Sequence, residues 1–301
     1  MEIVVFGAGS LGSLVGGALA RDPTHDVTLV GRDPHVGAVR ESGLELSGHI
    51  EATVTPSATT DGRGLAADLA IVAVKAFDTA SAAETLATGD YEAVLSLQNG
   101  MGNEETLAAR LEAPVLAGTA SYGAILHAPG RVECTGIGEL VLGARNGGRS
   151  DRADRIGSAF AAAGLETTVA DDMPRRLWEK LAVNAGINPV TALARTDNAA
   201  VLEAEGSDLA RGAARETARV ARACDVGLSN REALAALEAV ASDTAANTSS
   251  MHQDVRAERR TEIDAINGYV VDRASEQGLE VPTNRVLTSL VRTWEREREL
   301  R

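Results

Sequence analysis

Lysine is nearly absent from this chain of 301 residues. Of the 29 basic side chains only two, Lys75 and Lys180, are lysines, and all the others are arginines. Arginine keeps its proton at any ordinary pH, whereas the pKa of a lysine ammonium falls when the group is removed from water. Both lysines lie in segments with other signs of an active site, so each is a candidate for handling a proton. The alternative is that these two lysines remain by chance in an arginine-rich composition. The neighbouring residues decide between the two explanations.

Three further features of the sequence, namely its apolar runs, its cysteines and its net charge, argue against whole classes of protein. No apolar run approaches the roughly 20 residues that span a membrane, and no basic leader precedes the first apolar run. The two cysteines, Cys134 and Cys224, lie far apart and suggest no disulfide framework, which favours a reducing cytoplasm. The net charge is −14, which argues against nucleic acid and anionic membrane surfaces as partners.

The chain does contain an alternation of apolar runs and helical patterns. Strand-like runs occupy residues 3–6, 27–30, 69–74, 93–97 and 115–117, and helical patterns separate several of them. Continuous apolar strands of this kind indicate a parallel sheet that is covered on both faces. Residues 43–55 have the alternation of a small hairpin, and from residue 171 onward the pattern is helical, with breaks at Gly227 and at Val281-Pro282.

The first strand runs into a glycine-rich turn, Gly7-Ala8-Gly9-Ser10-Leu11-Gly12, which has the G-x-G-x-x-G spacing. Gly7 permits the tight turn, Gly9 lets the backbone approach a pyrophosphate, and Gly12 allows the helix to pack closely on the strand. A glycine turn without a ligand is the alternative. With the alternating pattern, the motif predicts an α/β fold, with an N-terminal Rossmann-type dinucleotide-binding domain over residues 1–170 and a C-terminal all-helical domain over residues 171–301.

The end of the second strand, Val30-Gly31-Arg32, bears on the choice of dinucleotide. An acidic residue there would hold the ribose 2′-hydroxyl of NAD, whereas the Arg32 that stands there suits the 2′-phosphate of NADP. Asp33 follows at once and leaves NAD open. We therefore expect NADP (NADPH) as the cofactor, with NAD as the alternative.

Two polar side chains follow apolar strands directly. Lys75 comes after the run 69–74, and Asn99 lies in Gln98-Asn99-Gly100-Met101-Gly102 after the run 93–97. Ligands of open α/β sheets bind outside the carboxyl ends of the strands, so both side chains are expected to contact cofactor or substrate. An ordinary turn is the alternative explanation of Asn99-Gly100.

A helix near residue 180 carries the main chemical signal. Lys180, Asn184 and Asn188 are four residues apart and share one helical face. Most of their neighbours are apolar, which predicts a buried helix whose polar stripe needs partners. A partly desolvated ammonium on such a face can donate a proton to a carbonyl oxygen that has received hydride. A solvated surface stripe is the alternative.

Two further polar segments lie in the helical half. In Asn247–Asp254, Ser250 and the glutamine three residues on fit a capping box, and first-turn N–H groups also suit a carboxylate ligand. Thr261–Asp264 is a second capping-box candidate, and its Glu262 falls on the side expected to pack inward, where a carboxylate needs a partner such as Lys180 or a substrate hydroxyl. The five histidines are scattered, so no metal site is expected.

Taken together, these residues resemble the ketopantoate reductase (2-dehydropantoate 2-reductase) family over nearly the full chain. The residues that carry the resemblance are Gly7–Gly12, Val74-Lys75-Ala76, Gln98–Gly102, Trp178–Leu181 with Asn184 and Asn188-Pro189, Ser249-Ser250-Met251 with Gln253-Asp254, and Glu262-Ile263-Asp264 with Asn267-Gly268. The last three groups are the most specific.

The resemblance implies reduction of 2-dehydropantoate to (R)-pantoate with NADPH, on the way to pantothenate and coenzyme A. It implies Lys180 as general acid and Glu262 as the group that holds the substrate's terminal hydroxyl and positions Lys180. It also implies a substrate carboxylate on Ser250 and a set of further contacts: Asn184, Asn188 and Asn247 around the substrate, Lys75 and Asn99 to cofactor and substrate, and Arg32 to the 2′-phosphate.

Two alternatives remain open at this point. One is a related NAD(P)-dependent reductase of another small 2-oxo acid, and the other is a dinucleotide sensor that binds without reacting. The helical half has enough apolar surface for a homodimer, but the sequence does not determine the oligomeric state.

Overall fold

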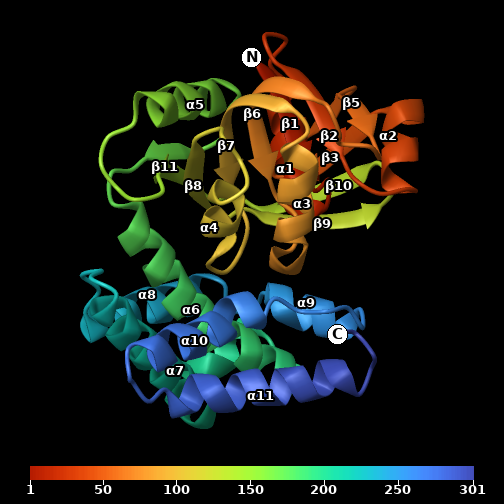
Figure 1. The fold of residues 1–301 in the computed structure, drawn as a ribbon. Helices are drawn as coiled ribbons and strands as arrows, with labels where there is room; N and C mark the ends of the chain where they lie inside the picture. The colour runs from red at the N-terminus through yellow and green to blue at the C-terminus, as the bar shows by residue number, and fades with distance from the viewer. The chain divides into compact units, whose positions relative to one another are not determined.

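A computed structural model describes residues 1–301 and divides into two compact units. The first consists of Met1–Gln98 and Asn103–Met173, and the second of Asn99–Gly102 and Pro174–Arg301. Figure 1 shows the strands gathered in the first unit and helices alone in the second.

The first unit is built on an eight-stranded sheet with the order β12-β11-β8-β7-β6-β1-β2-β5. Every neighbouring pair is parallel except β8 with β11. This confirms the predicted α/β class. The strands are β1 (Glu2–Phe6), β2 (Asp26–Val30), β5 (Ser57–Thr59), β6 (Ala66–Val72), β7 (Asp90–Ser96), β8 (Val115–Ala120), β11 (Leu140–Ala144) and β12 (Thr167–Val169).

The C-terminal parts of the central strands β1, β6 and β7 are buried because both faces of the sheet are covered. In β1, Ile3 and Val5 belong to one buried cluster and Val4 and Phe6 to another, as the two-residue period of a strand requires. Side chains of α1 and α5 join the first cluster and those of α3 and α4 the second. The helices are α1 (Ser10–Leu19), α2 (His35–Ser42), α3 (Thr79–Leu86), α4 (Asn103–Ala108) and α5 (Asp151–Ala162), with a short turn η1 (Ala76–Asp78) before α3.

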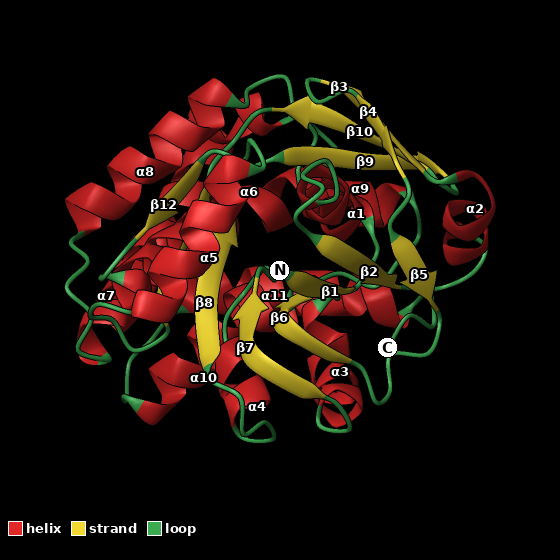
Figure 2. Ribbon diagram, turned by 90° about the horizontal axis from the view of Figure 1, so that it is seen from above, coloured by secondary structure: helices red, strands yellow, loops and turns green.

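A second, four-stranded sheet has the order β4-β3-β10-β9 and lies apart from the main sheet in Figure 2. The predicted hairpin over residues 43–55 is present as β3 (Leu44–Gly48) and β4 (Ala52–Val54). The parallel pairing of β3 with β10 (Arg131–Gly136) joins segments that are distant in the sequence. β10 also pairs antiparallel with β9 (Gly123–Ala128), the strand directly before it in the chain.

The second unit is all-helical, as predicted. Its helices are α6 (Met173–Ala194), α7 (Ala204–Ala223), α8 (Asn230–Asp243), α9 (Ser250–Arg256), α10 (Tyr269–Glu276) and α11 (Pro282–Arg296), with short turns η2 (Asn198–Leu202) and η3 (Asp264–Gly268). Gly227 lies in the break between α7 and α8, and the Val281-Pro282 step begins α11, with Val281 as the N-cap. None of the helices combines the length and apolar character that a membrane crossing requires.

Candidate active site

The glycine turn between β1 and α1 is fixed by packing at two of its three glycines. Gly7 has a φ of +103°, and a Cβ there would lie 2.6 Å from the backbone nitrogen of Val74. A Cβ on Gly12 would lie 2.1 Å from the carbonyl oxygen of Gly7. Only glycine fits at either position.

Gly9 is different, because neither conformation nor packing demands a glycine there. Its φ is −88°, and a Cβ would meet nothing within 4 Å. Gly9 is the N-cap of α1, and no side chain caps that helix end. The open space and the first-turn N–H groups therefore fit the close approach of a pyrophosphate. The Ser10 hydroxyl accepts a hydrogen bond from Leu126 N at 3.1 Å and keeps its own hydrogen available to donate.

Lys75 lies at the same edge of the sheet as the glycine turn, because Gly7 packs on the residue just before it. Gln98, at the end of β7, donates from Nε2 to Val74 O at 3.1 Å and to Thr79 Oγ1 at 2.7 Å. This amide joins the segment that follows β7 to the segment that follows β6 and contains Lys75. No specific role for Gln98 is predicted from the sequence, where the only signal is its place in the polar run that contains Asn99.

Arg32 follows β2 and extends into solvent, with its side chain 88% exposed. One of its guanidinium nitrogens lies 3.0 Å from Asp78 Oδ2. The Asp33 carboxylate accepts from Gly37 N at 3.0 Å and so is engaged with the first turn of α2. Both adjacent side chains are exposed, and each already has one polar partner.

In the second unit, α6 carries the predicted polar face. Lys180 and Asn184 are half-buried and Asn188 is buried, whereas the apolar residues between them are buried. The helix packs against the segment that follows Glu262: the rings of Trp178 and Tyr269 are 5.8 Å apart. Lys180 and Glu262 thus lie on neighbouring elements.

The start of α9 lies beside the C-terminal half of α6, where Thr191 Oγ1 and Ser249 Oγ are 2.7 Å apart. Ser249, and not Ser250, is the N-cap, since its hydroxyl accepts from His252 N at 3.2 Å. The predicted capping role of Ser250 is therefore wrong, and Ser250 is an exposed residue at the first helical position. Asn247 is also exposed.

Glu262 is buried, with 6% of its surface exposed. The second predicted capping box is absent, because the Thr261 hydroxyl donates to Glu295 at 2.7 Å and the Asp264 carboxylate accepts from Arg292 Nε at 2.8 Å. These long-range partners hold the residues on both sides of Glu262.

The loop that contains Asn99 packs on the turn that follows Glu262. Met101 N donates to Ala265 O at 2.9 Å, and a Cβ on Gly100, whose φ is +80°, would lie 2.5 Å from the Ala265 Cβ. Only a glycine permits this close approach. Asn99, Glu262 and the α6 face therefore belong to one assembly within the second unit.

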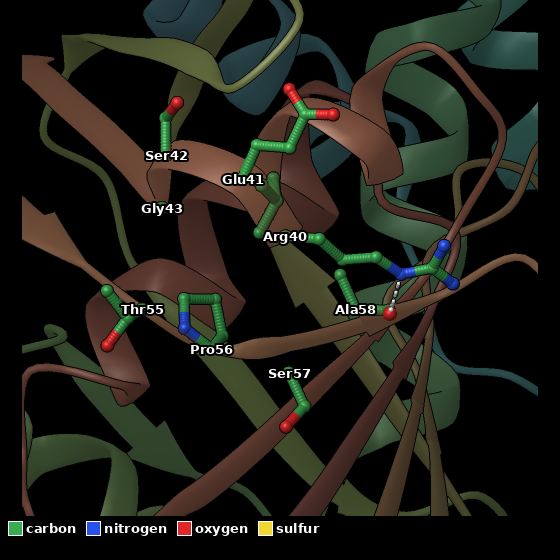
Figure 3. A pocket seen from close by; sticks show the side chains of 9 residues that line it. Arg40, Glu41, Ser42, Gly43, Thr55, Pro56, Ser57 and Ala58 are labelled. Carbon is green, nitrogen blue, oxygen red and sulfur yellow. Dashed lines mark hydrogen bonds between the residues drawn. The ribbon is translucent and has the colours of Figure 1, made fainter.

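A hollow of about 550 Å³ lies elsewhere, between the end of α2 and β5. Figure 3 shows Arg40 donating to Ala58 O, at 2.7 Å, in its wall. None of the predicted site residues lines it. No three histidine, cysteine or carboxylate side chains are grouped as metal ligands would be.

Two family models match the chain. Residues 3–147 match the model "Ketopantoate reductase PanE/ApbA" and residues 172–295 match its C-terminal counterpart. A 2-dehydropantoate 2-reductase of Halobacterium salinarum is 44% identical over 305 residues, which cover 99% of this chain and 100% of the relative.

Solved structures give the same fold. A PanE/ApbA family ketopantoate reductase from Ralstonia eutropha superposes with a TM-score of 0.91 and 35% identity, over 99% of this chain and 100% of the other. A D-mandelate dehydrogenase, solved with NADH and anilino(oxo)acetate, superposes with a TM-score of 0.92 at 25% identity over the full length of both chains.

Proposed function

The chain belongs to the ketopantoate reductase family, and we propose that it reduces 2-dehydropantoate to (R)-pantoate with NADPH, in the cytoplasmic synthesis of pantothenate and coenzyme A. The observation that carries the proposal is the assembly around Lys180. One of only two lysines in the chain stands on the half-buried polar face of α6, beside the element that contains the buried carboxylate of Glu262.

The chemistry divides between cofactor and protein. Bound NADPH supplies the hydride that the ketone carbon accepts. The Lys180 ammonium donates a proton to the ketone oxygen as negative charge develops on it. Glu262 accepts a hydrogen bond from the terminal hydroxyl of the substrate and positions the Lys180 ammonium.

Further side chains orient the substrate. The Ser250 hydroxyl donates to the substrate carboxylate, and the amides of Asn184, Asn188, Asn247 and Asn99 line its surroundings. On the cofactor side, the open backbone at Gly9 receives the pyrophosphate, Lys75 contacts the ribose, and Arg32 holds the 2′-phosphate. Residues 1–170 thus form the dinucleotide-binding domain and residues 171–301 the substrate-binding domain.

A reductase of another 2-oxo acid is the second candidate, because the D-mandelate dehydrogenase has the same fold over the full chain. The buried Glu262 favours ketopantoate, since its carboxylate can accept a hydrogen bond from the terminal hydroxyl of that substrate. The oxo acid that corresponds to mandelate, 2-oxo-2-phenylacetate, has no such hydroxyl. A sensor that only binds the dinucleotide would have no use for a half-buried lysine beside the carboxylate of Glu262.

The test is the loss of NADPH absorbance with matched substrates. Ketopantoate and 3,3-dimethyl-2-oxobutanoate differ only in the terminal hydroxyl. We expect kcat/KM for ketopantoate to exceed that for the analogue about 10²-fold or more, because the analogue lacks the hydroxyl that donates to the buried carboxylate of Glu262. A higher kcat/KM for 2-oxo-2-phenylacetate would favour the second candidate, and no absorbance change with any oxo acid would favour a sensor.

A further inference from the structure

A proline interrupts the hydrogen bonding of the helix that carries Lys180. Pro189 lies inside α6. Proline has no N–H, so the carbonyl of Ala185, four residues earlier, lacks the donor that a regular helix would supply. Ala185 is fully buried, and a buried carbonyl without a donor costs about 1–3 kcal/mol.

The missing donor comes from another element. Asn267, in η3, is fully buried and donates from Nδ2 to Ala185 O at 3.0 Å. Its second amide hydrogen goes to Asn284 Oδ1 at 3.0 Å.

The orientation of both amides follows from their surroundings. Asn284 donates from Nδ2 to Ala213 O at 3.1 Å and to Glu216 Oε2 at 2.8 Å, so its oxygen must face Asn267. A reversed Asn267 amide would then place its oxygen against two other oxygens. The Asn267 NH₂ group is thus directed at Ala185, and its own oxygen has no hydrogen-bond partner.

This contact joins the two elements that carry the proposed chemistry. Ala185 is the residue after Asn184 and lies five residues after Lys180, while Asn267 lies five residues after Glu262. An ordinary residue at position 189 would satisfy the Ala185 carbonyl within α6 and remove the need for a contact between elements. Pro189 keeps that carbonyl available.

We infer that Pro189 and Asn267 form a matched pair, in which the proline frees the Ala185 carbonyl and Asn267 uses it to hold the Lys180 face of α6 in register with the turn of Glu262. Asn267 is a positioning residue and touches no substrate. The effect on rate rests on the proposed function; the pairing itself does not.

The experiment is a double-mutant cycle with Asn267→Ala, Pro189→Ala and their combination, read by kcat, KM and thermal unfolding. Asn267→Ala is expected to lower kcat about tenfold with little change in KM, because misplaced catalytic groups slow the chemical step. Pro189→Ala alone stays within about threefold of the parent, since a carbonyl oxygen can accept two hydrogen bonds. In the double variant the restored N–H reaches Ala185 O, so most of the Tm loss of Asn267→Ala is recovered. Its kcat stays low, because no bond then joins α6 to the turn of Glu262.

A matched control uses Asn198, a buried asparagine whose amide donates to Thr244 Oγ1 at 2.9 Å and not to α6. Pro189→Ala is expected to leave the defect of Asn198→Ala unchanged. A double variant whose Tm shows the two losses simply added, or an Asn267→Ala variant that keeps the parent kcat, would overturn the inference. If the Tm losses are coupled but the parent protein does not reduce ketopantoate, the pairing stands and the proposed function fails.

Discussion

Arg32 extends into solvent from the end of β2, and its ion pair with Asp78 is exposed. Such exposed pairs contribute about 0–1 kcal/mol, so a phosphate can replace Asp78 at little cost. A charge-assisted hydrogen bond to the phosphate contributes about 1.5–3 kcal/mol.

Replacing Arg32 with Ala is therefore expected to raise KM for NADPH about tenfold or more and to leave KM for NADH nearly unchanged. Steady-state kinetics with both cofactors provide the measurement. Asp78→Ala is the control, because it frees the guanidinium and should not raise KM for NADPH. An equal rise in KM for both cofactors would show that Arg32 does not bind the 2′-phosphate.

His35 is a buried titratable residue near the cofactor side of the first unit. Its Nδ1 accepts from Gly130 N at 3.0 Å, so Nε2 carries the hydrogen and donates to Ser13 Oγ at 2.9 Å. Burial lowers the pKa of the His35 imidazole below its ordinary value. Protonation would place a hydrogen on Nδ1, against the Gly130 N–H.

The free energy of unfolding is expected to fall as the pH drops below about 6.5, the pKa of histidine in an unfolded chain. The sign follows because the unfolded state then binds the proton more readily than the folded one. Denaturant unfolding between pH 7.5 and pH 5 measures the slope. A His35→Gln variant should show a shallower slope, and an identical slope in that variant would contradict the assignment.

At the scale of elements, α11 holds the turn that contains Glu262. Glu295, in α11, is fully buried; one of its oxygens accepts from Thr261 N at 2.8 Å and the other from Arg301 at 2.7 Å. Arg301 also donates to Asp264 at 2.8 Å. Burial alone would raise the pKa of the Asp264 carboxyl, but hydrogen bonds from Arg292 and Arg301 hold it below its ordinary value.

Arg301→Met is expected to lower the free energy of unfolding by about 2–3 kcal/mol, because it leaves a buried carboxylate short of a charged partner. Arg298→Met is the matched control, since Arg298 is exposed and stacks on Trp294, with its guanidinium 4.6 Å from the ring. Denaturant unfolding of both variants at pH 7 provides the comparison. Equal losses in the two variants would rule out a bridging role for Arg301.

At the scale of the whole molecule, the periodicity of apolar residues along the sequence predicts the elements that are long and covered on both faces. The main strands were predictable because both of their faces are apolar. The three-residue strand β5 and the pairing of β3 with β10 were not, because they depend on contacts between distant segments.

The candidate site also has some features that the local sequence predicts and others that depend on tertiary contacts. The glycine motif and the spacing of Lys180, Asn184 and Asn188 are local features, so both could be predicted directly from the sequence. Which of two adjacent serines caps α9 could not, since the hydroxyl of Ser249 is selected by a tertiary contact with Thr191. The hydrogen bond from Asn267 to Ala185 O in α6 could not be predicted either, because it also joins distant segments.

The most direct test of the proposed mechanism is single-turnover loss of NADPH absorbance with saturating ketopantoate in Lys180→Ala and Lys180→Arg. Arginine retains the charge but cannot release a proton, so both variants are expected to be slower than the parent by about 10² or more while remaining folded. A Lys180→Arg enzyme that turns over at nearly the parent rate would contradict the role of Lys180 as the proton donor.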